Sequence, residues 1–396
     1  MNYHIFPQDK FFDAYIEDIY KLHQEHNNVF WVRGNKGDST LLKTERPVIY
    51  IGNEKGLIID RLKMLNPEDK LFVSWYDLFI GECIMESGIC NALYVYLMGG
   101  DFYDDPAGYH NHWLYDKYTK KIVDKLQLPP INLKKRPHNW NKTIKEIRVR
   151  KNYLKQISDD YKKKLETISR IDYLVTGADN NGEIDLIRNL YPDFRAKYVY
   201  GSYDQNFDLA KDILSSETYS GNRPLRVLLG NSADPTNNHI DACKFLLKTI
   251  PVDKEIICPL SYGGPDYSNL FQQWAQKHLQ DQFFPINNFM NRKDYIEFLN
   301  KMDIVVMFHN RQQALGNIIT SLVLDKPVFL KTNNPVYSML KNMGIPSVYD
   351  VSQIRSLNLS EICASTYSHR KTCVSIIQKY FSEQARLRDL QNLIIK

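Results

Sequence analysis

The sequence lacks any apolar run of the roughly 18 to 20 residues that a membrane-spanning helix needs. It does not open on a basic region followed by an apolar stretch, so we expect no secretory signal and a cytoplasmic location. The six cysteines form no Cys-x-x-Cys pair, which argues against a disulfide framework or a zinc site. Internal repeats and low-complexity segments are also absent.

Two common phosphate-binding motifs are missing as well. The chain has neither a Gly-x-Gly-x-x-Gly loop nor the lysine of a Walker motif, so a dinucleotide-binding or ATPase function is not supported. What remains is a globular composition, with 43% hydrophobic and 24% charged residues over 396 positions. That length is enough for two domains of ordinary size.

Basic residues are unevenly spread, although the formal net charge is only +5. They crowd between residues 117 and 164, including Lys-Lys-Arg at 134–136 and Lys-Lys-Lys at 162–164. Such a stretch is compatible with a solvated helix face, or with a surface attracted to anionic lipid or polyphosphate. We expect no nucleic-acid partner.

Strand patterns alternate with helix patterns in both halves, which predicts parallel sheets and an α/β fold. In the first half, strands are predicted at 2–6, 28–34, 46–52, 70–76, 91–102, 170–177 and 196–202. The first-half helices are predicted at 12–23 and within 110–170. In the second half, strands are predicted at 225–230, 255–260, 282–286, 303–309 and 327–331. The helices between those strands are predicted at 237–250, 266–280, 292–301 and 313–324.

A polar segment at 215–224 contains glycine and proline and separates the two periodic regions. We therefore predict two α/β domains, at 1–218 and 219–368. A long amphipathic helix is expected within 369–396, packing back on the first domain.

Two loops at strand ends in the second half have the composition of ligand-binding turns, because open parallel sheets bind ligands at the carboxyl ends of their strands. Gly230, Asn231 and Ser232 precede a predicted helix, where backbone N–H groups favour phosphate. Asn and Ser are also ordinary helix caps. Tyr262 and Gly263 follow the next strand, where a plain turn is an equally good explanation.

A third loop, His309–Asn317, is polar between two apolar elements. It places Arg311, Gln312, Gln313, Gly316 and Asn317 around one helix start. A diphosphate is bound by this combination of backbone N–H groups, a helix dipole and a planar cation. In the first half, Asp101 follows a buried-looking strand and Gly99-Gly100; it could deprotonate an acceptor hydroxyl, or only form a turn or helix cap.

These segments carry a resemblance to a known family. VLLGNSADPTNNH (227–239) and FHNRQQALGNIITSLVLDKPVFLKTNNPVYSML (308–340) resemble the TDP-N-acetylfucosamine:lipid II N-acetylfucosaminyltransferases of enterobacterial common antigen synthesis. YLMGGDFYD (96–104) is similar to an aromatic-rich segment of that family, with glycine in place of its Trp. The match is good over 225–345 and thin over 70–200.

The resemblance implies a GT-B glycosyltransferase, with two Rossmann-like domains facing across a cleft. The N-terminal domain (1–218) would bind the acceptor and the C-terminal domain (219–368) the nucleotide sugar. It implies a nucleotide-diphosphate sugar donor, dTDP- or UDP-linked, a lipid-linked saccharide acceptor and transfer without a metal or other cofactor. Arg311 would then be catalytic, neutralising the departing diphosphate, and Asp101 the base of an inverting reaction. A nucleotide-sugar epimerase of the same shape and a non-catalytic nucleotide-binding protein remain as alternatives.

Overall fold

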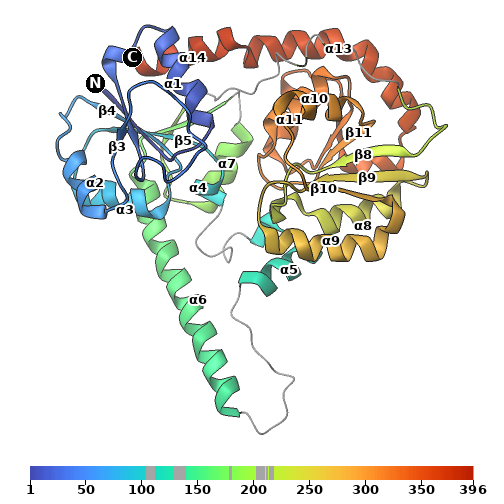
Figure 1. Ribbon diagram of the computed structural model, residues 1–396, viewed down its shortest axis with the longest axis horizontal. Coiled ribbons are helices and arrows are strands. Elements are labelled where there is room, and N and C mark those ends of the chain that lie inside the picture. The colour runs from blue at the N-terminus through green and yellow to red at the C-terminus, as the bar shows by residue number, and fades with distance from the viewer. Residues whose placement is uncertain are drawn as a thin grey trace. The chain divides into compact units, whose positions relative to one another are not determined.

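Two separate parallel sheets form the framework of the protein in a computed structural model (Figure 1). The structure describes residues 1–103, 112–127, 140–177, 181–201, 210, 213 and 218–395. The described residues fall into two compact units. Unit 1 draws on 1–110, 154–204 and 380–396, and unit 2 draws on 111–153 and 205–379.

The sheet of unit 1 has the strand order β3-β2-β1-β4-β5-β6-β7. Its strands are β1 (Asn2–Phe6), β2 (Asn28–Val32), β3 (Ile49–Tyr50), β4 (Lys70–Ser74), β5 (Ala92–Tyr96), β6 (Tyr173–Thr176) and β7 (Lys197–Tyr200). The helices in the same residue ranges are α1 (Phe11–Lys21), α2 (Lys55–Leu62), α3 (Leu78–Ser87), α4 (Gly100–Tyr103) and α7 (Asn181–Leu190).

The sheet of unit 2 has the strand order β10-β9-β8-β11-β12-β13. Its strands are β8 (Leu225–Leu229), β9 (Lys254–Pro259), β10 (Phe283–Ile286), β11 (Ile304–Met307), β12 (Val328–Leu330) and β13 (Val348–Asp350). The helices are α5 (Lys117–Gln127), α8 (His239–Thr249), α9 (Pro265–Leu279), α10 (Arg292–Asn300), α11 (Leu315–Val323), α12 (Pro335–Asn342) and α13 (Leu359–Phe381). α6 (Trp140–Ser169) belongs in part to each unit's range, and α14 (Glu383–Ile395) to unit 1.

The central strands of unit 2 are buried along their whole length. β11 reads Ile-Val-Val-Met and β12 reads Val-Phe-Leu, the continuous apolar runs of strands covered on both faces. A single apolar cluster joins β8, β9 and β11 to α8 and α9. This rigid core fixes where the loops at the strand ends lie.

The unit boundaries differ from the predicted domain ranges. Residues 111–153 fall in unit 2, because the first turn of α5 packs against α8 and is capped by it. The backbone N–H groups of Tyr118 and Thr119 donate to the two carboxylate oxygens of Asp241, at 3.0 and 2.8 Å. The described residues 112–127 and 140–153 therefore group with unit 2 by their contacts, whereas the predicted range 1–218 assigned them to the first domain.

The C-terminal segment is two helices instead of the single helix predicted within 369–394, with Ser382 between α13 and α14 (Figure 1). Leu390, Leu393 and Ile394 of α14 join the apolar core around β1 and β2. The buried carboxylate of Asp18 on α1 accepts two hydrogen bonds from Arg386, at 2.6 and 3.1 Å. α14 is thus an integral part of unit 1.

Candidate active site

The order of strands in unit 2 reverses between β8 and β11. From β8 the chain proceeds outward to β9 and β10, and from β11 it proceeds the other way to β12 and β13. Loops at such a reversal diverge and leave room for a ligand outside the carboxyl ends of the strands. The predicted loops after β8 and β11 flank this point.

The loop after β8 is held by one buried amide, that of Asn237. Its Oδ1 accepts from the backbone N–H of Asn231 at 3.0 Å, and its Nδ2 donates to the carbonyls of Ser232 and Asp234 at 3.2 and 2.9 Å. Gly230 has φ +71°, and a Cβ there would lie 2.5 Å from Asn237 Oδ1. Glycine is therefore required at this turn both by backbone conformation and by space.

Hydrogen bonds join the loop after β8 to the loops after β9 and β11. The hydroxyl of Thr236 donates to Gln313 Oε1 at 2.6 Å, and Gln313 Nε2 donates to Asn231 Oδ1 at 3.2 Å. On the other side, the backbone N–H of Ala233 donates to the carbonyl of Tyr262 at 2.6 Å. Gly263, with φ +120°, lies so close that a Cβ would meet the backbone of Ala233 at 2.7 Å.

Arg311 is the cation of the third loop and is only 7% exposed. Its Nη1 donates to the carbonyl of Gln312 at 3.1 Å. Ala314, in a left-handed conformation, is the N-cap of α11, so Gly316 falls in the first turn of that helix. The guanidinium and the N-terminal N–H groups of α11 therefore belong to the same short segment, as binding of an anion requires.

Two buried histidines lie beneath these loops. His309 Nε2 lies 2.8 Å from Asn237 Oδ1, and His239 Nδ1 lies 3.2 Å from the hydroxyl of Tyr267. Burial lowers the pKa of His239 to about 3; burial and then the nearby Arg311 guanidinium lower the pKa of His309 well below its ordinary value. Both histidine rings are neutral at pH 7, so neither adds a positive charge beside the guanidinium of Arg311.

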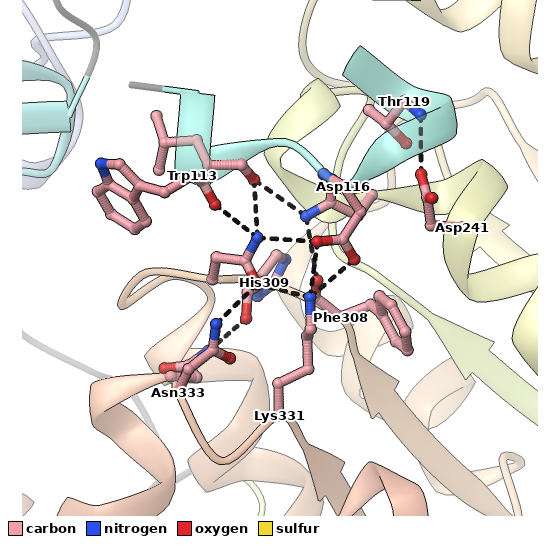
Figure 2. Close-up of polar contacts among 12 residues, drawn as sticks. Trp113, Asp116, Thr119, Asp241, Phe308, His309, Lys331 and Asn333 are labelled. Atoms are coloured by element: carbon pink, nitrogen blue, oxygen red, sulfur yellow. Dashed lines mark hydrogen bonds and ion pairs between the residues drawn. The ribbon is translucent and has the colours of Figure 1, made fainter. Parts of the chain in front are cut away.

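A polar cluster on the adjoining strand ends joins the segment before α5 to the loop that carries Arg311 (Figure 2). Lys331 Nζ contacts the carboxylate of Asp116 at 2.7 and 2.9 Å and donates to Asn310 Oδ1 at 2.5 Å. Asn310 Nδ2 donates to the carbonyl of Trp113 at 2.7 Å. The backbone N–H of Asp116 donates to Asn238 Oδ1 at 2.7 Å. The charge of Lys331 is therefore balanced inside the cluster.

The sequence prediction did not assign roles to Asn237, His239, Asn310, Asp116 or Lys331. The run Asn237-Asn238-His239 was a usable signal, since it follows the Gly-Asn-Ser loop directly. The Asp116–Lys331 pair joins residues 215 positions apart, and single-sequence patterns carry no information on such pairs.

Two predicted site residues have hydrogen-bond partners outside the three loops. Asn317 Nδ2 donates to the hydroxyl of Tyr295 on α10, at 3.1 Å, and so links α11 to α10. Asp101 belongs to unit 1, where both carboxylate oxygens accept from the backbone N–H of Met98 at 3.2 Å. That contact is the turn-forming role considered for Asp101. Burial raises its pKa to about 6.

Within the described ranges, no group of three or more His, Cys, Asp or Glu side chains is arranged to hold a metal ion. None of the described helices is both long enough and apolar enough to cross a membrane. The basic triplet 134–136 lies outside the described residues. In the triplet 162–164, Lys162 and Lys163 are exposed and Lys164 is buried.

Solved structures with low sequence identity share this fold along nearly the whole chain. One is described as trehalose-6-phosphate from E. coli bound with UDP-2-fluoro glucose, with TM-score 0.54, 10% identity and 99% of each chain covered. Sucrose-phosphate synthase from Thermosynechococcus elongatus has TM-score 0.54 and 10% identity, covering 99% of this chain and 97% of its own. An alpha-glucosyltransferase (AGT) in complex with UDP has TM-score 0.51 and 11% identity, covering 100% of both chains.

These likenesses confirm the predicted α/β class and the GT-B fold, with two Rossmann-like domains. The sequence profile described as 4-alpha-L-fucosyltransferase, glycosyl transferase group 56, matches residues 176–386. That match covers more than half of the chain, so the protein belongs to this family.

The protein is accordingly a glycosyltransferase. The family match is consistent with the resemblance drawn from 227–239 and 308–340, both of which lie within the matched residues. Of the three functions that the sequence left open, it supports sugar transfer over epimerisation or binding alone.

Proposed function

We propose that the loops after β8, β9 and β11 bind the diphosphate and sugar of a dTDP- or UDP-linked donor. The supporting observation is the hydrogen-bonded link between Asn231 and Gln313 across the strand reversal, beside the buried Arg311. The remaining donor contacts are assigned to Gly230, Ser232, Tyr262, Gly263, Gln312, Gly316 and Asn317. Arg311 and the N-terminus of α11 neutralise the departing nucleotide diphosphate in the transition state.

A thermal-shift comparison of dTDP, UDP and GDP tests this donor site. A bound nucleotide stabilises the folded protein by mass action, by about 2.7 kcal/mol when its concentration is a hundredfold above Kd. We expect dTDP or UDP to raise the melting temperature of the protein. We expect the sugar nucleotide that contains the stabilising nucleotide to be consumed only when acceptor is added. Stabilisation by none of the three nucleotides would contradict the donor proposal.

Transfer is expected to survive EDTA unchanged. Arg311 and the helix N-terminus supply the positive charge, and no Asp-x-Asp follows a strand in the second half to hold a metal–diphosphate complex. The measurement is the initial rate of transfer before and after chelation. A loss of rate that magnesium or manganese restores would overturn metal-free transfer.

Asp101 is our candidate base if the reaction inverts the anomeric centre. With its pKa raised to about 6, its carboxylate is ionised at pH 7 and becomes protonated, and unable to accept a proton, as the pH falls through 6. We expect kcat to fall about tenfold per pH unit below about pH 6 in the wild type. Asp101→Asn is expected to lower kcat by roughly a hundredfold or more at pH 7.5.

A matched control for Asp101→Asn is Asp60→Asn, which changes an exposed carboxylate on α2. If Asp101→Asn folds and keeps the kcat and the pH profile of the control, Asp101 acts only in the turn at Met98.

We further propose a lipid-linked acceptor at the cytoplasmic face of a bacterial membrane, in surface glycan synthesis. The supporting surface is the first half of α6, where Ile144, Ile147 and Val149 are 44, 47 and 49% exposed. Exposed cations accompany them at Lys145, Arg148, Lys151 and Lys155. Apolar side chains flanked by cations suit a surface of anionic lipid headgroups.

The protein is therefore expected to co-sediment with anionic liposomes at low salt and to be released by high salt. Each of the four cations contributes about 1 kcal/mol near an anionic surface. Arg148, Lys151 and Lys155 changed together to glutamate should abolish co-sedimentation while nucleotide binding persists. The control replaces three exposed lysines of unit 1, Lys36, Lys43 and Lys63, by glutamate. If both triple variants bind anionic liposomes equally well, α6 is not the membrane-binding surface. If the wild-type protein does not bind anionic liposomes, an acceptor that is not lipid-linked is favoured.

A further inference from the structure

We infer that Trp75, Arg33 and Asp77 form a saccharide-binding subsite in unit 1, which holds the acceptor sugar. The inference rests on the proposed function, because it takes the donor to be bound by unit 2. It extends that function by naming the side chains that recognise the second substrate.

The position of this subsite follows from the strand order of unit 1. The order reverses between β1 and β4, with β2 and β3 on one side and β5 to β7 on the other. Such a reversal is where an open parallel sheet leaves a crevice for a ligand. Arg33 directly follows β2, and Trp75 and Asp77 follow β4, so all three belong to the carboxyl ends of strands beside the reversal.

An ion pair crosses this point of the sheet. Arg33 Nη1 lies 2.8 Å from Asp77 Oδ2, and because β1 lies between β2 and β4, the pair passes over the end of β1. The backbone of Arg33 is fixed by its own N–H, which donates to the carbonyl of Phe6 at 2.9 Å. Asp77 is fixed by capping α3, its Oδ1 accepting from the N–H of Ile80 at 2.9 Å. The two charged groups are thus preorganised on rigid elements.

Trp75 is the strained residue of the same strand end. It has φ +59°, a left-handed conformation that is a genuine outlier for a bulky side chain. Its indole N–H is enclosed and finds no acceptor among the described residues, although the side chain as a whole is partly exposed. The ring packs in part against the apolar core of unit 1. Neither the backbone preference of a bulky residue nor a hydrogen bond of its own accounts for the left-handed conformation, and strain of this kind gathers at ligand sites.

The chemistry of the three side chains matches a sugar ring. A pyranose presents a face of C–H groups that packs on an aromatic ring, and hydroxyl groups at its edge that bind charged planar groups. Trp75 supplies a partly exposed aromatic surface, and the Arg33–Asp77 pair supplies charge-assisted donors and acceptors. A nucleotide diphosphate is a poorer fit, because the carboxylate of Asp77 would repel it.

The test is saturation-transfer NMR with methyl glycosides of a hexose, an N-acetylhexosamine and a hexuronic acid, each titrated with and without saturating dTDP or UDP. The variants are Trp75→Phe, which keeps a ring but loses the indole, and Asp77→Asn, which keeps a good helix cap but loses the charge. Glu17→Gln is the matched control, since it breaks the exposed pair with Arg46, also at 2.8 Å, elsewhere in unit 1.

We expect at least one glycoside to bind wild type and Glu17→Gln with nucleotide present, and its Kd to rise about tenfold in Asp77→Asn and in Trp75→Phe. Melting temperatures with and without nucleotide report folding and the donor site separately. No glycoside signal from nucleotide-bound wild type, or equal Kd values in all four proteins, would overturn the subsite. Absence of nucleotide binding would instead overturn the donor proposal, whatever the glycosides show.

Discussion

Arg311→Ala is expected to lower kcat by about a hundredfold or more, which is the usual cost of removing one group that stabilises transition-state charge. Arg311 is the cation of the β11 loop, 7% exposed and adjacent to the N-terminus of α11. Negative charge grows on the nucleotide diphosphate as the glycosidic bond breaks, so the loss should exceed any loss in ground-state donor binding. Steady-state kinetics with varied donor separates the change in kcat from the change in KM.

Two further variants make this result interpretable. Arg311→Lys keeps a positive charge without the planar geometry and should recover part of kcat, which a purely structural role would not produce. Arg226→Ala removes a half-exposed arginine of β8 that pairs with Glu255, and should leave kcat unchanged. If Arg311→Ala folds and its kcat equals that of Arg226→Ala, the diphosphate is bound elsewhere.

Gly230→Ala is expected to destabilise unit 2 by about 2 to 4 kcal/mol, from a left-handed conformation and an overpacked site together. The new Cβ would meet Asn237 Oδ1 at 2.5 Å and His239 Nε2 at 3.0 Å, neither of which is at the end of a long flexible chain. Displacing Asn237 also releases the N–H of Asn231 and the ring of His309, so nucleotide affinity should fall as well. Urea unfolding and nucleotide titration measure the two effects.

Gly264→Ala is the matched control for Gly230→Ala. Gly264 lies in the neighbouring loop after β9, its φ is −76°, and a Cβ there meets nothing within 4 Å. We expect this variant to unfold and bind nucleotide like the wild type. Equal stability of the two alanine variants would mean that the Asn237 amide can move away from Gly230 at little cost.

The sequence predicted five of the six strands of the second sheet and missed β13, the edge strand. The central strands were predictable because runs such as Ile-Val-Val-Met in β11 are typical of strands covered on both faces, and the loops that follow them are polar by contrast. In the first half the prediction missed α2, α3, α4 and α7, and the strand predicted at 91–102 ends at Tyr96, before α4. α2, for example, exposes Leu57 while burying Ile58, so its apolar pattern is weak.

The candidate site was predictable where it consists of consecutive residues, as in 230–232 and 311–313. Contacts between distant segments were not, because they depend on how the finished elements pack. The Asp116–Lys331 pair joins the residue before α5 to the residue after β12. Asn317, a predicted donor contact, also donates to the hydroxyl of Tyr295 on α10. For Asp101 the sequence left a base and a turn former open, and in the structure its carboxylate accepts from the N–H of Met98 within its own turn.

The C-terminal helix α14 packs in unit 1, together with the N-terminal residues of the chain. This arrangement sets the order in which the two units can be completed during synthesis. Unit 2 ends at residue 379, so every strand and helix of its core is available before α14 has been made. The first strands of unit 1 are synthesised at the beginning of translation, but two of their partners come at its end. Asp18 accepts from Arg386, and the side chain of Asn2 donates to the carbonyl of Ile394 at 3.0 Å. The half that is synthesised first therefore reaches its native core last, against the usual N-terminal-first order of domain folding.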